Sequence, residues 1–170
     1  VRKGSSQIKY GPQSTGGALN YISTSIPRDF RVKANLFGGQ FNTYKAHVNI
    51  GSSGETFGYL LETFIDQTTG FKNLDHAGQN TGFSKADYLG KFRFNTPKSF
   101  TIPAAIELKY SITDELSNES YLGLSRSDFS IDPLRRYAAS GIDEMDADHA
   151  QTVLTGVVKL LPNVDLTVAY

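Results

Sequence analysis

Residues 104–112 read AAIELKYSI, and every second residue of this stretch is apolar. The apolar positions alternate with Glu107, Lys109 and Ser111. Successive side chains of a β-strand point to opposite faces, so a period of two describes a strand with one apolar and one polar face. The stretch therefore predicts a β-strand that is wet on one side only.

The same alternation recurs along the chain after Pro27. It predicts further strands at residues 30–36, 44–50, 57–66, 85–94 and 150–160, and from residue 164 onward. No segment of comparable length has the period of an amphipathic helix. We therefore predict an all-β protein of consecutive antiparallel strands.

The links between the predicted strands alternate in length. Three are short and rich in Gly, Pro, Ser or Asn, which predicts tight turns at residues 51–55, 96–99 and 161–163. The links on the opposite rim lie at residues 38–42, 67–82 and 113–148. Short turns on one rim and longer loops on the other are typical of outer-membrane β-barrels.

The polar row of the strands carries most of their charge and is expected to face inward. Its members are Arg31, Lys33, Lys45, His47, Glu62, Asp66, Lys85, Asp87, Lys91, Arg93, Glu107 and Lys109. Such a row suits a polar lumen and suits solvent equally well. Aromatic residues gather near strand ends, as interfacial girdles require, at Phe37, Phe41, Tyr44, Phe57, Tyr59, Phe92, Phe94 and Phe100.

Composition excludes some classes of protein and leaves others open. Seventeen Lys and Arg balance seventeen Asp and Glu, so no overall field favours nucleic acid. The absence of cysteine excludes a disulfide framework and thiolate metal sites. The chain starts without methionine and stops within an apolar alternation, so we expect a piece of a longer protein.

Residues 9–27, KYGPQSTGGALNYISTSIP, combine a Gly-Pro turn, a Gly-Gly pair and an expected short strand at residues 18–22. This segment resembles the last part of the plug domain in TonB-dependent outer-membrane receptors. The resemblance implies that residues 1–27 end a plug and that residues 28–170 form the first seven strands of a transmembrane antiparallel β-barrel.

Two further stretches resemble the ferric dicitrate receptor-like branch of that family, namely residues 120–140, SYLGLSRSDFSIDPLRRYAAS, and residues 44–51, YKAHVNIG. Membership implies a plugged barrel of about 22 strands in the outer membrane of a Gram-negative bacterium. It also implies active uptake of a ferric chelate, energised by the TonB protein through an N-terminal box that this chain lacks. The chelate would be the transported ligand, with no cofactor, and lipopolysaccharide would surround the barrel.

The expected chelate ligands are Arg135 and Arg136 in the long outer loop, because guanidinium groups bind carboxylates in bidentate fashion. On the plug, Gln13 and Ser14 follow the Gly-Pro turn and present polar groups. An alternative remains for the two arginines, which is that they hold the loop against Asp128, Asp132 or Asp143, or contact lipopolysaccharide phosphate. A purely structural turn remains the alternative for Gln13 and Ser14.

No combination of residues predicts catalysis or a metal site. His47, His76 and His149 are far apart in sequence, and no serine has a His and an Asp in a recognisable nucleophile turn. The acidic cluster at residues 143–148 lacks the glycine and closing glutamate of a calcium loop and is expected in a solvated outer loop. We therefore expect a protein that is not an enzyme.

Three classes of function remain open from the sequence. The first is import of a ferric chelate, the second a passive or adhesin-type outer-membrane barrel, and the third a soluble β-sandwich binding module. The plug-like segment at residues 9–27 favours the importer, because a simple porin has no domain preceding its first strand.

Overall fold

The computed structural model describes residues 21–76 and 80–170. Its strands are β1 (Arg31–Gly38), β2 (Tyr44–Ser53), β3 (Phe57–Thr68), β4 (Asn73–Leu74), β5 (Phe83–Asn95), β6 (Ala104–Asn118), β7 (Arg135–Arg136), β8 (Glu144–Leu161) and β9 (Val164–Ala169). The helical elements are α1 (Arg126–Ile131) and the 3₁₀ helix η2 (Ala138–Ile142). Within the described residues, no helix is long and apolar enough to cross a membrane.

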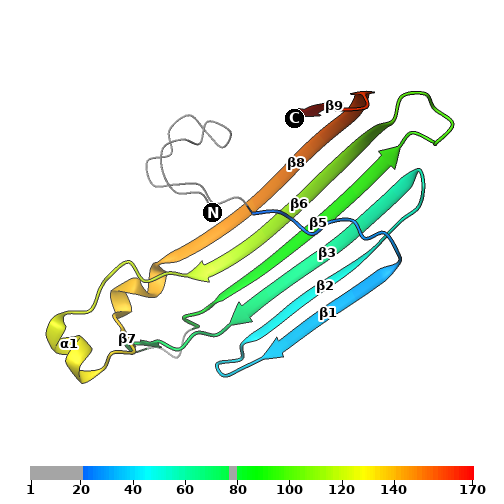
Figure 1. The fold of residues 1–170 in the computed structure, drawn as a ribbon. Coiled ribbons are helices and arrows are strands. Elements are labelled where there is room, and N and C mark those ends of the chain that lie inside the picture. Colours follow the sequence, from blue (N-terminus) through cyan, green and yellow to red (C-terminus); the bar gives the residue numbers. More distant parts are fainter. Residues whose placement is uncertain (1–20, 77–79) are drawn as a thin grey trace.

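Seven strands form one antiparallel sheet in the order β1-β2-β3-β5-β6-β8-β9 (Figure 1). Each strand pairs with the long strand that follows it, which confirms the prediction of an all-β fold of consecutive hairpins. Strands β4 and β7 form a separate parallel pair between two loops. The short strand expected at residues 18–22 lies mostly outside the described residues, and Tyr21 and Ile22 are not in a strand.

The prediction of a loop across residues 113–148 was wrong at both ends. Strand β6 continues to Asn118 and β8 begins at Glu144, and the two pair without a break from Thr113 opposite His149 to Asn118 opposite Glu144. These strand ends are rich in polar residues, so they lack the apolar alternation that marks the rest of each strand. Backbone pairing with the neighbouring strand makes them strands.

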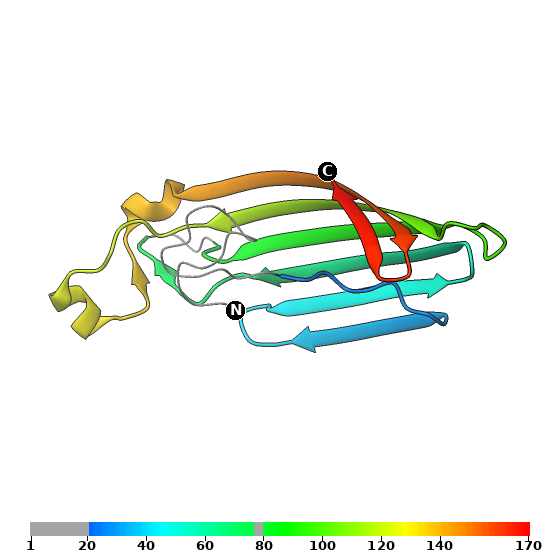
Figure 2. The same cartoon turned by 45° about the horizontal axis from the view of Figure 1, so that its top comes forward.

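The register places the apolar rows of all seven strands on one face of the sheet. Leu108 lies opposite Phe92 on one side and Leu154 on the other, while Ile106 lies opposite Phe94 and Gly156. This face is open: for example, Ile106 is 49% exposed and Leu36 is 79% exposed. Figure 2 shows a single curved layer of strands. Among the hydrophobic residues of the described chain, Leu60 alone is buried.

The opposite face, called the polar face below, carries ion pairs between neighbouring strands. Lys45 Nζ lies 2.6 Å from Asp66 Oδ2, Lys85 Nζ lies 3.0 Å from Glu115 Oε2, and Arg93 pairs with Glu107. Each pair joins residues directly opposite in the register or nearly so, as cross-strand charge pairs require. The row that the sequence assigned to one face does lie on one face.

The hairpin between β3 and β5 closes tightly at two glycines. Gly70 has a φ of +79°, a conformation that favours glycine. A Cβ on Gly82 would overlap the carbonyl oxygen of Thr68, whereas a Cβ on Gly156 would meet no atom within 4 Å. Gly70 and Gly82 are therefore required by the close approach of two backbone segments. The surroundings of Gly156 would admit a side chain.

We predict that Gly82→Ala lowers the free energy of unfolding by about 1 to 3 kcal/mol, because the backbone must shift to admit the methyl group. Gly156→Ala is the matched control and should be neutral or slightly stabilising, since alanine loses less chain entropy on folding. The midpoint of thermal unfolding, followed by circular dichroism, checks both. Equal midpoints for the two variants would contradict the close approach at Gly82.

Candidate functional site

The candidate site lies at the end of the sheet where the longer loops gather, with α1 and β7 (Figure 1). Residues 69–82 link β3 to β5, and residues 119–143 link β6 to β8. The pair β4–β7 joins these two loops, through hydrogen bonds from Asn73 N to Leu134 O (2.8 Å) and from Asp75 N to Arg136 O (2.9 Å). The two loops are therefore one connected unit, called the loop cluster below.

Arg135 connects the loop cluster through its side chain. Its Nε lies 2.9 Å from Asp75 Oδ1 and its Nη2 lies 2.9 Å from Asp75 Oδ2, a bidentate contact between the two loops. Its Nη1 donates to Asp128 Oδ1 at 3.1 Å. The guanidinium carbon lies 5.0 Å from the centre of the Tyr137 ring, a distance suited to a cation–π contact. Arg135 thus has two carboxylate partners from this chain.

Arg136 closes the base of the longer loop from inside. It is 4% exposed, and its guanidinium donates to the backbone carbonyl oxygens of Asn118, Glu119, Ser140 and Asp143. These carbonyls come from the end of β6 and from the segment that leads into β8. A buried guanidinium that satisfies carbonyls at both ends of a loop holds those ends together.

Helix α1 is fixed to the same cluster by its N-cap. The Ser125 hydroxyl accepts from Asp128 N at 3.1 Å, and Tyr137 donates its hydroxyl to Asp128 Oδ2 at 2.6 Å. The Tyr137 hydroxyl also accepts from Ser125 N at 3.0 Å. A serine followed three residues later by an acidic residue is a recognised start signal for a helix. Helix α1 was not predicted from the sequence, and this spacing is the signal that could have found it, because the helix is too short to show helical periodicity.

The charged partners shift the pKa values of the cluster. Hydrogen bonds from Arg135 hold the pKa of the Asp75 carboxyl below its usual value of 3.8, and the same contact raises the pKa of Arg135. Hydrogen bonds from Tyr137 and Ser125 lower the pKa of Asp128. Because the Asp75 pKa is lower in the folded chain, its contribution to stability is complete above the usual value. It is lost as the pH falls through the folded value.

The structure places both predicted arginines, Arg135 and Arg136, in the loop cluster. Arg135 contacts Asp128, one of the partners named for the alternative structural role. Asp75, which the sequence did not suggest, is the second partner. Gln13 and Ser14 lie outside the described residues. A direct contact of the arginines with a chelate stays a prediction.

The residues considered for metal binding lie on separate elements. His47 is on β2, His76 follows β4 and His149 is on β8. In residues 21–76 and 80–170, no group of three His, Asp or Glu residues is arranged to hold a metal ion. The expected loop placement of the acidic residues was wrong, because Glu144, Asp146 and Asp148 belong to β8.

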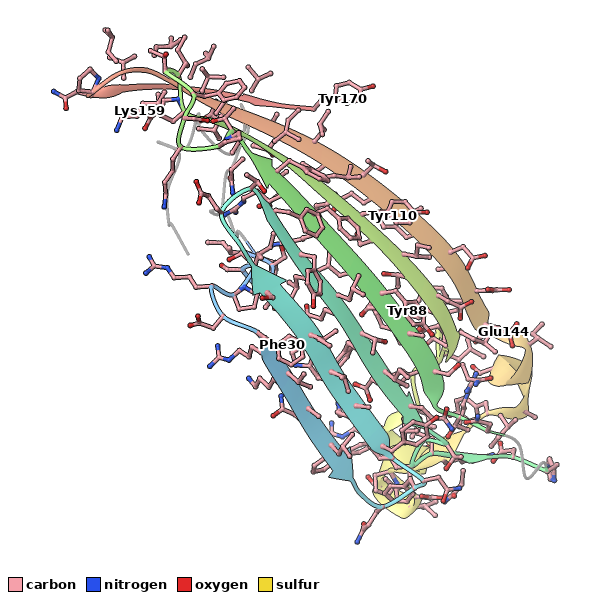
Figure 3. All side chains as sticks on the ribbon, turned by 90° about the vertical axis from the view of Figure 1, so that its right-hand side faces the viewer. Phe30, Tyr88, Tyr110, Glu144, Lys159 and Tyr170 are labelled. Atoms are coloured by element: carbon pink, nitrogen blue, oxygen red, sulfur yellow. The ribbon has the colours of Figure 1, made fainter. Side chains whose placement is uncertain are left out.

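An open hollow of about 380 Å³ lies on the apolar face, and its lining includes Tyr88 on β5 and Tyr110 on β6. Figure 3 labels both tyrosines. Gly90 is also part of the lining of the hollow and stands opposite Tyr110 in the register. Its lining comes from the strands β2, β3, β5 and β6. The hollow is therefore separate from the loop cluster.

We predict that Asp75→Asn lowers the hydrogen-exchange protection of the Asn73 amide at neutral pH, because the charge-assisted contact with Arg135 is lost. In the native protein the same protection should be constant at neutral pH and fall below pH 3.8. Asp165→Asn on β9 is the control and should leave the Asn73 amide unchanged. Equal protection in the native protein and in Asp75→Asn would exclude Asp75 from the connection between the loops.

No model of a known protein family matches the sequence, and no solved structure matches the fold significantly. The structural features that bear on function are the two faces of the sheet and the loop cluster.

Proposed function

We propose that this chain is part of a TonB-dependent outer-membrane receptor that imports a ferric chelate. The observation that carries the proposal is the asymmetry of the sheet. One face is a continuous exposed apolar surface, and the other is polar and is crossed by the segment that precedes β1 (Figures 1 and 2). A barrel wall with lipid outside and a plug inside needs this arrangement.

The extent of the apolar surface supports a membrane location. At about 3.4 Å per residue, the run from Ala104 to Ile112 is about 27 Å long. Tilted by about 40°, it spans about 21 Å, close to the apolar band of about 25 Å in outer-membrane barrels. The next outward position on β6 is Asp114, which lies opposite Asp148 on β8. Two exposed carboxylates thus mark the end of the band on the loop side.

Aromatic residues support the opposite limit of the band. Phe57 and Phe94 lie directly opposite each other near the short turns, with ring centres 5.0 Å apart. Tyr59 stacks on Phe57 at 6.2 Å. On the loop side, Tyr44 donates its hydroxyl to Gln67 at 2.8 Å. Aromatic rings at both limits are what the two membrane interfaces favour.

The loop cluster supports a role on the outer side of the membrane. Arg135 connects the two loops, so that they hold one position relative to each other. A chelate that contacts one loop therefore also affects the position of the other. An anionic iron chelate would suit the partly exposed guanidinium group of Arg135, and lipopolysaccharide phosphate offers the same chemistry. The substrate class rests on the resemblance of residues 44–51 and 120–140 to the ferric dicitrate receptor-like branch.

We predict that lipid-soluble oxygen increases the relaxation rate of a spin label at Ile106, and that an aqueous nickel chelate increases the relaxation rate of a label at Lys109. A lysine at Ile106 should cost about 2 to 4 kcal/mol if the residue lies near the bilayer midplane. The measurements use the complete protein in lipid vesicles. Faster relaxation of both labels by the aqueous nickel chelate would indicate a soluble sandwich instead of a barrel.

Uptake of radiolabelled iron by cells that carry the complete receptor tests the function itself. Iron supplied as ferric citrate should enter only when TonB is present, because active import needs its energy. Uptake that is equal with and without TonB would indicate a passive barrel and overturn the proposal. Iron supplied as a hydroxamate or catecholate chelate separates the substrate classes.

The role of Arg135 is tested in the same cells. Direct contact with the chelate predicts that Arg135→Ala weakens binding roughly tenfold or more, while Asp75→Asn, which keeps the guanidinium, weakens it less. If Arg135 acts only by connecting the loops, the two single variants and the double variant should show equal affinities. Surface expression is measured in parallel to exclude loss of the folded receptor.

A further inference from the structure

The segment at residues 23–28 crosses the polar face of the sheet before the chain enters β1 (Figures 1 and 2). Its contacts come from three strands, β2, β3 and β5. Ser23, Thr24, Ile26 and Pro27 are partly buried, while Ser25 is exposed. This segment is called the strap below.

Two glycines make room for the strap. A Cβ on Gly51 would lie 2.7 Å from Pro27 Cδ, and a Cβ on Gly58 would lie 3.2 Å from Ile26 Cγ2. Both glycines face the same side of the sheet, on neighbouring strands β2 and β3. The strap therefore lies against the backbone of the sheet where side chains are absent, as a close approach of two chains requires.

Ser53 holds the end of the strap nearest β1. Its hydroxyl donates to Pro27 O at 2.9 Å, and its backbone N–H donates to Arg28 O at 3.3 Å. Pro27 has no N–H of its own and a restricted φ, so the strap is stiff at this point. The position of the chain just before β1 is thus set by β2.

Glu62 and Lys91 hold the other end. Thr24 donates its hydroxyl to Glu62 Oε2 at 2.6 Å, and the same oxygen accepts from Asn49 Nδ2 at 3.3 Å. His47 Nε2 lies 3.2 Å from it. Lys91 is 7% exposed and donates its ammonium to Thr24 O at 2.6 Å and to Ser23 O at 3.3 Å.

The energetic asymmetry of these contacts makes the strap a fixed part of the sheet. A buried ammonium that loses its carbonyl partners is left without hydrogen bonds, which costs far more than the net gain from forming them. Release of the strap would remove hydrogen-bond partners from the Lys91 ammonium and the Glu62 carboxylate. That loss is unfavourable unless water enters the site and replaces them. Leu60, which is 1% exposed, lies on the same face between Gly51 and Lys91, the two residues that Pro27 and Thr24 approach.

We infer that the strap is a permanent anchor, so that residues 24–28 stay bound to the sheet during chelate import. The inference rests on the proposed function, since it assigns the part of the receptor that stays fixed during transport. Glu62 and Lys91 hold the strap in place and are therefore positioning residues for the segment before β1.

A spin label at Ser25→Cys in the complete receptor tests the anchor. Residues 1–170 contain no cysteine, so this part of the receptor adds no second labelling site. The label should be slow in the native protein, and Glu62→Gln combined with Lys91→Met should shorten its rotational correlation time several-fold. Glu107→Gln combined with Lys109→Met is the matched control, because Glu107 pairs with Arg93 and Lys109 donates to Gln151.

Addition of ferric citrate, alone and with the purified TonB C-terminal domain, should leave the Ser25 label slow. A label that is fast in the native protein, or unchanged in the Glu62→Gln and Lys91→Met variant, would exclude the anchor. A label that becomes fast on addition of chelate and TonB would show that the strap is released and would overturn the inference. Failure of TonB-dependent uptake would refute the proposed function, while the native and variant mobilities still decide the anchor.

Discussion

The antiparallel hydrogen-bond ladder that runs from β1 to β9 is the constraint on which the other features depend. Pairing is continuous from β1 through β6 to β8, and the one irregularity lies between Lys159 and Leu161. Because side chains alternate with a period of two, the ladder transmits the facing of one strand to the next. A slip of one residue at a single hairpin would place Ile106 among charged side chains and Glu107 on the apolar face.

The ladder produces a sheet that lacks a second layer. A soluble domain buries its apolar face against another element, yet here that face is exposed and Leu60, the buried hydrophobic residue of the described chain, lies on the other side. The polar face is stabilised by cross-strand ion pairs such as Lys45–Asp66. One face is therefore suited to apolar surroundings and the other to polar surroundings. This difference is the basis of the proposed membrane location.

The loops and the strap are held by a different kind of interaction from the strands. Arg135, Arg136 and Lys91 each bind an oxygen atom of a residue outside the seven-stranded sheet, namely Asp75, Ser140 and Thr24. Each of these cations donates to more than one oxygen atom, which makes its contacts directional and costly to break. Backbone pairing thus holds the sheet together. Charged side chains hold the strap that crosses the sheet and the loop cluster at its end. The connection of the two loops and the anchoring of the strap follow from that division.

The sequence by itself determined the strands and their facing, because alternation is a local property and each residue of a strand has its side set by backbone geometry. It did not determine where β6 ends and β8 begins, since residues 113–118 and 144–149 are mostly polar and become strand through pairing with each other. It did not predict the contact between Asp75 and Arg135, which are 60 residues apart. Gly51 and Gly58 read as turn and strand residues, and their role at the strap exists only where the chain folds back over them. Such contacts depend on which segments the hairpins bring together, and only the tertiary structure decides that.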